Sequence, residues 1–328
     1  MPPRAFFGER PSYKRLRGSV GDLRQLASVR RIVLDDGPER GVRALAFSTG
    51  GGLDFWVLSD RSFDIGPMWF GGMPIAWQGS NGFRNPALHD AADDEGQGFE
   101  RSFSGFLVTC GLDHVRQPRS GRPLHGRLPF TPGRLRAYGE DWERDVPILF
   151  CQGEVTQARI GGEALRLYRR IEAPIGGTSL VIEDRVENLS AEPQAHEILY
   201  HFNLGFPAIR ESTHVLLGKN KLIDSLPLPA PKGETKVRCV HVEEAEEARC
   251  VVRTPLGNGN NLEIVFGFST STLPFVQIWE NLRANEYVLG VEPCNTNRGL
   301  DGATDGVVPL APGATRDYKL AVSVAQTA

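Results

Sequence analysis

The sequence predicts an all-β protein built as a large antiparallel β-sandwich or barrel. Short segments of alternating apolar and polar residues recur along the chain, and turn-forming residues separate them. The 37 glycines and 23 prolines are spread over the 328 residues instead of forming one linker. Convincing helical periodicity is rare, so strands joined by turns account for most of the chain.

Two pairs of segments predict β-hairpins. GVRALAFST and GLDFWVLSD, residues 41–49 and 52–60, are separated by a glycine turn. ALRLYRRIEA and SLVIEDRVENLS, residues 164–173 and 179–190, flank a second glycine turn at Gly176–Gly177. Strands are also expected in two later segments, NLEIVFGFS and RDYKLAVSVAQ.

The length allows two domains, but a β-sandwich of this size is often a single domain. We therefore predict one domain over residues 41–328, preceded by an N-terminal arm, residues 1–40, that packs on it. A short helix is predicted within the arm at residues 21–30, where two leucines and a valine fall on one side.

Composition excludes several classes of partner. Charged residues make up 23% of the chain and the net charge is -3, which argues against nucleic acid as the main partner. The sequence shows neither a secretory signal nor an apolar run long enough to span a membrane. The five cysteines are scattered and form no C-x-x-C pair, which favours a reducing compartment. A cytoplasmic location is therefore expected, and a homodimer is one option that the sequence leaves open.

The stretch HEILYHFNLGFP, residues 196–207, places polar residues in a predicted strand. Because side chains alternate along a strand, one face is apolar or aromatic and should pack on the core. The opposite face carries His201 and Asn203, which need polar partners if that face is also covered. A satisfied structural histidine and a histidine in a ligand cleft both fit this pattern.

Four other segments contain candidate residues. Glu292 ends an apolar strand directly before a proline, which fixes an extended backbone there. His125 lies in PLHGRLPFTP, a loop whose prolines and glycine constrain its shape. Asp113 precedes a histidine in TCGLDHV, and Arg61 lies between two aspartates in LSDRSFDIG. An arginine between carboxylates suits hydroxyl or anion binding, and it is equally common in surface salt bridges.

Taken in order, the segments DRSFDIG, TCGLDHV, PLHGR, YHFNLGFP and VEPCN resemble the aldose 1-epimerase (galactose mutarotase) family. They are most similar to its divergent, uncharacterised branch, which is known as a domain of unknown function. The resemblance covers the chain from about Val42 to the C-terminus. It implies a galactose mutarotase-like β-supersandwich, with a small-molecule carbohydrate bound on the concave face of a large sheet.

The resemblance also implies an isomerase mechanism that needs neither a cofactor nor a metal. Glu292 would take the proton from the anomeric hydroxyl, while His201 would protonate the ring oxygen on the other side of the sugar. The ring would open to an aldehyde and reclose as the other anomer. Trp279 could stack on a sugar face. The residues expected to bind the substrate are Arg61, Asp113, His125, Asn203 and Gln277.

Two other functions fit the same residues. His114, His125, His201 and Glu292 could hold a divalent metal in a sugar isomerase or lyase, although no H-x-H spacing supports this. A non-catalytic carbohydrate-binding protein could also use the same fold. The loops SNGFRNP and HGRLPF differ from the orthodox mutarotase pattern, so the sugar is left open.

Overall fold

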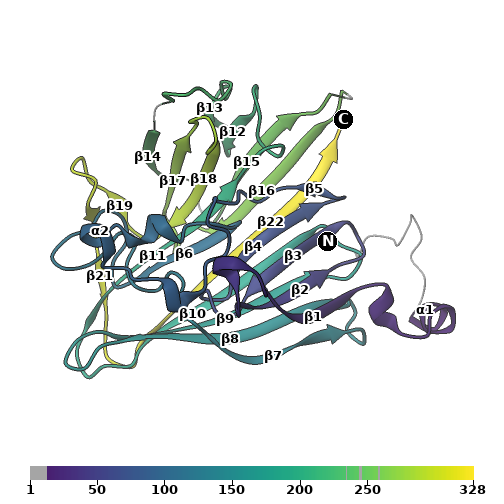
Figure 1. Cartoon of the computed structure of the whole chain (residues 1–328), viewed down its shortest axis with the longest axis horizontal. Coiled ribbons are helices and arrows are strands. Elements are labelled where there is room, and N and C mark those ends of the chain that lie inside the picture. The colour runs from purple at the N-terminus through teal and green to yellow at the C-terminus, as the bar shows by residue number, and fades with distance from the viewer. Residues whose placement is uncertain (1–12, 234, 244–245, 258) are drawn as a thin grey trace.

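The computed structural model describes residues 13–328 except 234, 244–245 and 258, so the first twelve residues of the expected arm lie outside the described residues. The described chain is nearly all β and contains three large antiparallel sheets (Figure 1). This confirms the all-β supersandwich that the sequence predicts. No helix among the described residues is long and apolar enough to cross a membrane.

The largest sheet has nine strands in the order β13-β12-β15-β16-β22-β10-β9-β8-β7. The hairpin predicted around the Gly176–Gly177 turn is confirmed as β9 paired with β10, and the two later segments form β16 and most of β22. The strand bounds are β7 Arg134–Asp141, β8 Ile148–Ala158, β9 Ala164–Pro174, β10 Ser179–Asn188, β12 His214–Leu217, β13 Asn220–Ile223, β15 Glu247–Pro255, β16 Asn261–Ser269 and β22 Thr315–Thr327.

The six-stranded sheet contains the strand formed by the HEILYHFNLGFP stretch. This strand, β11, pairs with β18, with β6 and with β21, and the order continues from β18 to β17 and β14. The bounds are β6 Leu107–Leu112, β11 Gln194–Leu204, β14 Thr235–His241, β17 Phe275–Asn281, β18 Val288–Cys294 and β21 Val308–Leu310.

The five-stranded sheet, in the order β1 to β5, contains the other predicted hairpin as β2 and β3. The helix predicted at residues 21–30 is wrong: a 3-10 turn, Leu23–Gln25, is followed two residues later by β1. Local leucine spacing is outweighed there by the backbone hydrogen bonds that β1 makes with β2. The bounds are β1 Ser28–Val33, β2 Arg43–Ser48, β3 Leu53–Leu58, β4 Asp64–Phe70 and β5 Met73–Pro74.

The expected division between arm and domain at residue 40 stays a prediction, but β1 lies before it and is already part of this sheet. A two-stranded sheet joins β19 and β20. The remaining elements are β19 Asn297–Arg298, β20 Thr304–Asp305, α1 Tyr13–Ser19, α2 Asp93–Gly96, η2 Gly37–Glu39, η3 Pro86–Leu88 and η4 Gly98–Arg101.

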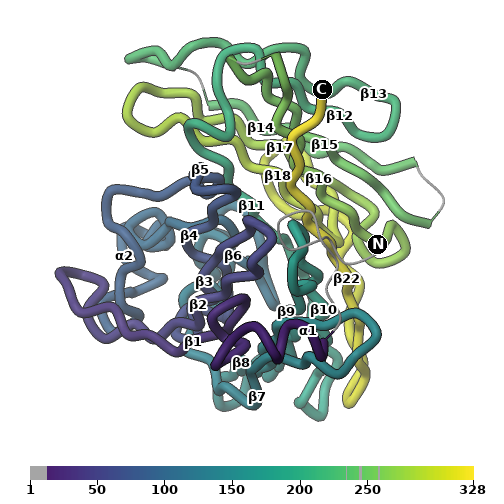
Figure 2. Tube along the Cα trace, turned by 90° about the vertical axis from the view of Figure 1, so that its right-hand side faces the viewer, coloured from purple at the N-terminus to yellow at the C-terminus, as the bar shows by residue number. Residues whose placement is uncertain are grey.

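The nine-stranded sheet packs against both of the other sheets (Figure 2). Phe63, directly before β4, lies over Gly153 of β8, where an added Cβ would come within 2.2 Å of the ring. On β11, Phe202 contacts Phe266 of β16 with ring centroids 5.0 Å apart. The apolar face of β11 therefore lies in the core between sheets, and His201 must project from the opposite face.

Candidate functional site

A row of polar side chains crosses three neighbouring strands of the six-stranded sheet. Gln277 on β17 pairs directly with Glu292 on β18. The β11–β18 register pairs Phe202 with Val291, which places His201 opposite Glu292. Side chains that lie opposite each other on one face of a sheet are in contact range. The register therefore brings together the histidine and the glutamate that sequence analysis expected to act as a pair.

The side chains in this row contact one another directly. His201 Nε2 lies 3.3 Å from Glu292 Oε1. Gln277 Nε2 donates a hydrogen bond of 2.5 Å to Glu292 Oε2. Gly290 leaves room for the pair, because a Cβ there would lie 2.6 Å from Glu292 Oε1 and 3.1 Å from His201 Cε1. A side chain at position 290 would push the two groups apart.

Three polar atoms of this cluster are buried without a hydrogen-bond partner in the described part of the chain: His201 Nδ1, Glu292 Oε1 and Asn203 Oδ1. Asn203 uses its amide group instead, donating to the carbonyls of Gly105 and His201 at 3.0 Å. Buried polar atoms are almost always paired in native proteins, and each exception calls for an explanation. A ligand with hydroxyl groups would supply the missing partners.

Burial shifts the two titratable groups in opposite directions. Glu292 is fully buried, and burial raises its pKa to about 8, although Gln277 and Arg116 act to lower it. His201 is 4% exposed, and burial lowers its pKa to about 3. At neutral pH the His201–Glu292 pair therefore consists of a neutral imidazole and a protonated carboxyl group. The pair holds one proton, on Glu292.

His125 reaches the cluster from the loop predicted to hold it. Its backbone has a φ of 60°, and its Nδ1 accepts a hydrogen bond of 3.4 Å from the Arg116 amide. The loop approaches the chain so closely that a Cβ on Gly126 would lie 2.3 Å from the Gly111 carbonyl oxygen. The His125 ring centroid is 5.6 Å from that of His201. Burial, and then the neighbouring His201 and Arg116, hold the pKa of His125 well below its usual value.

Aromatic rings surround His201 on its remaining sides. The Phe103 ring centroid lies 4.9 Å from the imidazole and the Trp279 ring centroid 5.3 Å from it, both in edge-to-face geometry. Both aromatic side chains are half-buried. The sequence placed His201 and Glu292 on opposite sides of a space for a sugar, whereas the structure places them in contact. At 3.3 Å between Nε2 and Oε1, the two side chains leave no room for a sugar between them.

Arg116 is a member of this site that sequence analysis missed. Its side chain is almost fully buried, and its Nε donates a hydrogen bond of 3.3 Å to Gln277 Oε1. Its other nitrogens donate to Thr296 and to the hydroxyl of Thr304. Arg116 therefore orients the Gln277 amide so that its NH₂ group faces Glu292. Its position in an irregular loop gives no periodic signal by which it could have been found.

Two predicted site residues have their contacts elsewhere. The Arg61 guanidinium donates to the carbonyls of Arg84 and Ser102 at 2.6 and 2.5 Å. Asp113 accepts hydrogen bonds from Gln157 at 2.5 Å and from Arg122 at 3.0 Å. Both side chains are buried and hold neighbouring segments in place. Hydroxyl binding by either residue stays a prediction.

The residues considered for a metal site are only partly brought together. His125, His201 and Glu292 lie in one cluster, whereas His114 Nε2 is hydrogen-bonded to the Gln117 carbonyl at 2.8 Å. Within the described ranges, no group of three or more His, Cys, Asp or Glu side chains is arranged to hold a metal ion.

Solved structures show which class of fold this is. A candidate aldose 1-epimerase from Klebsiella pneumoniae superposes with a TM-score of 0.80 at 20% identity, covering 90% of this chain and 83% of that one. A galactose mutarotase-like protein from Clostridium acetobutylicum gives 0.59 at 12%, covering 91% and 98%. Galactose 1-epimerase from Lactobacillus acidophilus gives 0.56 at 9%, covering 92% and 99%. The fold is thus that of the galactose mutarotase-like proteins.

The family is narrower than this fold class. The family model described as domain of unknown function DUF4432 matches residues 39–324, so the chain belongs to that family. No protein with a curated description matches the chain.

Proposed function

We propose that the protein is an aldose 1-epimerase-like isomerase in which His201 and Glu292 open and reclose a sugar ring by acid–base catalysis. The observation that carries the proposal is the direct contact between these two buried groups, which belong to different strands. Both retain unpartnered polar atoms, and strongly shifted pKa values are common at catalytic sites. The fold shared with the epimerase-like structures is consistent with this chemistry.

The protonation of the resting pair suggests how the proton moves. Neutral His201 accepts the proton of the anomeric hydroxyl, while the Glu292 carboxyl group donates its proton to the ring oxygen. The bond between the anomeric carbon and the ring oxygen breaks, leaving an open-chain aldehyde beside an imidazolium and a carboxylate. After rotation, the ring oxygen attacks the other face of the aldehyde, and both protons return.

This assignment exchanges the roles that the family resemblance implies, where His201 is the acid and Glu292 the base. Both assignments use one shared proton, so they differ only in which group holds it when the sugar binds. Burial favours the proton on Glu292. The fully buried carboxyl group is then neutral at rest and does not have to hold an unpaired charge.

The sugar has to reach a pair that is covered. His201 is surrounded by the half-buried rings of Phe103, Trp279 and His125, and we place the approach of the sugar between them. Phe103 follows the short η4 turn and lies outside the strands, so it can move more readily than Trp279 in β17. Trp279 then offers a ring against which a sugar can pack.

Anomer exchange measured by NMR tests the proposal. Wild-type protein and His201→Gln are compared on aldoses, sugar acids and sugar phosphates at equal concentration. We expect accelerated exchange of at least one sugar, and a loss of about 10²–10⁴-fold in His201→Gln. Exchange no faster than in buffer for every sugar, or equal rates for the two proteins, would overturn the proposal.

A further inference from the structure

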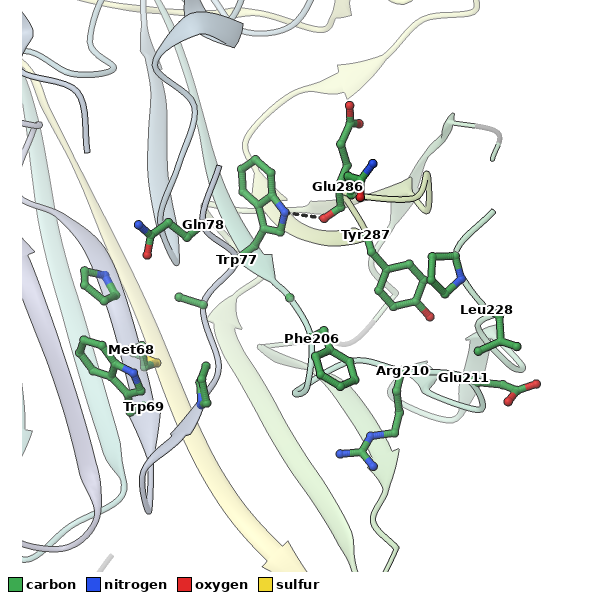
Figure 3. A pocket seen from close by; sticks show the side chains of 16 residues that line it. Met68, Trp69, Trp77, Gln78, Phe206, Arg210, Glu211, Leu228, Glu286 and Tyr287 are labelled. Atoms are coloured by element: carbon green, nitrogen blue, oxygen red, sulfur yellow. Dashed lines mark hydrogen bonds between the residues drawn. The ribbon is translucent and has the colours of Figure 1, made fainter. Parts of the chain in front are cut away.

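A cavity lies beyond the C-terminal end of β11, on the far side of Trp77 from the His201–Glu292 pair. It has a volume of about 660 Å³, which is within the range of small-molecule sites. Four parts of the chain form its walls: β4 and β5 with the residues after β5, the segment after β11, the chain after β13, and the turn between β17 and β18 (Figure 3).

Hydrogen bonds between distant segments fix these walls. Trp77 Nε1 donates to the Glu286 carbonyl at 2.7 Å, which ties the segment after β5 to the turn before β18. Tyr287 donates its hydroxyl proton to the Pro227 carbonyl at 2.7 Å, which ties the same turn to the chain after β13. The cavity is therefore formed before any ligand arrives, and a preformed site loses little entropy on binding.

Aromatic rings give the cavity flat apolar surfaces. Phe206 is 73% exposed although it lies only two residues after the buried end of β11 at Leu204. Trp69 lies on another wall and is supported by Trp56, with ring centroids 5.8 Å apart. An exposed phenylalanine beside a preformed cavity is explained if a ligand covers it.

The polar groups of the lining include both donors and acceptors. Arg210 makes one long hydrogen bond, 3.4 Å from its guanidinium to the Pro207 carbonyl, and its Nε is buried without a partner in the described chain. Glu211 and Glu286 also line the cavity, and Figure 3 shows their carboxylates extending away from its centre. One cation beside two carboxylates does not make an anion-binding site. Hydroxyl groups, which both donate and accept, match this mixture.

We propose that this cavity is a second saccharide-binding site, distinct from the His201–Glu292 pair. A saccharide ring has an apolar face that can pack on Phe206 or Trp69, and its hydroxyl groups can pair with Arg210 and the polar rim. The ring contacts from Trp77 to Phe103 and from Phe103 to His201 separate the two sites. The proposal concerns binding, so it holds whether or not His201 and Glu292 are catalytic.

Titration calorimetry on the full chain tests this site with lactose, maltose, cellobiose and sucrose. We expect at least one of them to bind, and Phe206→Ala to weaken that binding about two- to tenfold. Arg210→Ala should also weaken it, and the double variant should weaken it most. Tyr138→Ala is the matched control. This tyrosine is 40% exposed on β7, an edge strand of the nine-stranded sheet, and does not line the cavity.

Two results would overturn the proposal: no disaccharide binds, or binding is unchanged in both Phe206→Ala and Arg210→Ala. Binding that is lost in His201→Gln but kept in the cavity variants would also overturn it, because the saccharide would then occupy the first site. Unchanged anomer exchange in Phe206→Ala, together with weakened disaccharide binding, would separate the two sites. Gln78→Ala, which alters an exposed residue of the rim, provides a further variant if Arg210→Ala does not fold.

Discussion

Tyr200 and His201 are neighbours in β11, yet they belong to two buried polar clusters that differ in how fully their atoms are paired. Tyr200 faces the nine-stranded sheet, where its hydroxyl donates to Asp184 at 2.8 Å. Arg169 binds the same carboxylate twice, at 2.9 and 2.6 Å, and also donates to Asp64 at 2.7 Å. Thr109 donates both its amide and its hydroxyl to Asp64.

The cluster around His201 on the other face is different. It holds three titratable side chains, His125, His201 and Glu292. Among the described residues, no cation is bound directly to its carboxyl group, and three of its buried polar atoms lack hydrogen-bond partners. A buried charge is tolerated only when it is well paired, whereas a functional site keeps atoms available for its ligand. On this comparison we propose that the Arg169 cluster serves stability and the His201 cluster serves chemistry.

The largest expected effect is on the Arg169 cluster. Arg169→Met leaves two carboxylates buried without their cation and should lower the free energy of unfolding by about 3–5 kcal/mol, measured by urea denaturation. Arg185→Met provides the control, because Arg185 forms an exposed ion pair with Asp317 and should change stability little. Equal effects of the two substitutions would contradict a structural role for the buried cluster.

Tyr200→Phe removes one hydroxyl from the same cluster and keeps the ring. The lost hydrogen bond to the Asp184 carboxylate should cost about 1.5–3 kcal/mol in the free energy of unfolding. Anomer exchange should stay unchanged, because Tyr200 faces away from His201. Slower exchange in a fully folded variant would show that the two clusters are coupled through β11.

The pH dependence of stability should reveal the shared proton. Between about pH 4.5 and 6.5 the pair binds one proton in both the folded and the unfolded chain, so it contributes no slope. Above pH 6.5 the unfolded histidine loses its proton while folded Glu292 keeps its own up to about pH 8. Stability should therefore fall over this window.

The comparison is made with Glu292→Gln, in which this fall should be absent. Urea denaturation at pH 6.5 and 8 should show wild type losing about 1–2 kcal/mol more than the variant over this window. Wild-type and variant stabilities that change in parallel over the same window would mean that Glu292 is already ionised in the folded protein.

The smallest expected effect concerns Arg116, which is a positioning residue. Its charge lowers the pKa of Glu292, so Arg116→Met should raise that pKa further. If Glu292 is the acid, the alkaline limb of the rate profile should move to higher pH. A lower rate with an unmoved limb would instead indicate that Arg116 only supports the fold.

Much of the fold could be predicted because alternation and glycine turns are local signals. They located both hairpins and put His201 and Asn203 on one face of their strand. The helix at residues 21–30 failed because pairing with β2 is a tertiary interaction that local spacing does not contain.

The site itself could not be predicted without the pairing register of the strands in the six-stranded sheet. The partners of β11 come from three distant parts of the chain, so only the family resemblance linked His201 to Glu292 before the structure did. Arg116 could not be found, because it acts from an irregular loop through Gln277. Arg61 resembled a ligand-binding arginine in the sequence, yet its donors meet backbone carbonyls that spacing cannot reveal.

The most direct test measures Glu292→Gln for both properties at once, at pH 8. The proposed role of Glu292 predicts that anomer exchange falls by about 10²–10⁴-fold while the free energy of unfolding stays the same or rises. Exchange at the wild-type rate in a protein that has lost stability would contradict it, because Glu292 would then be a structural residue like Asp184.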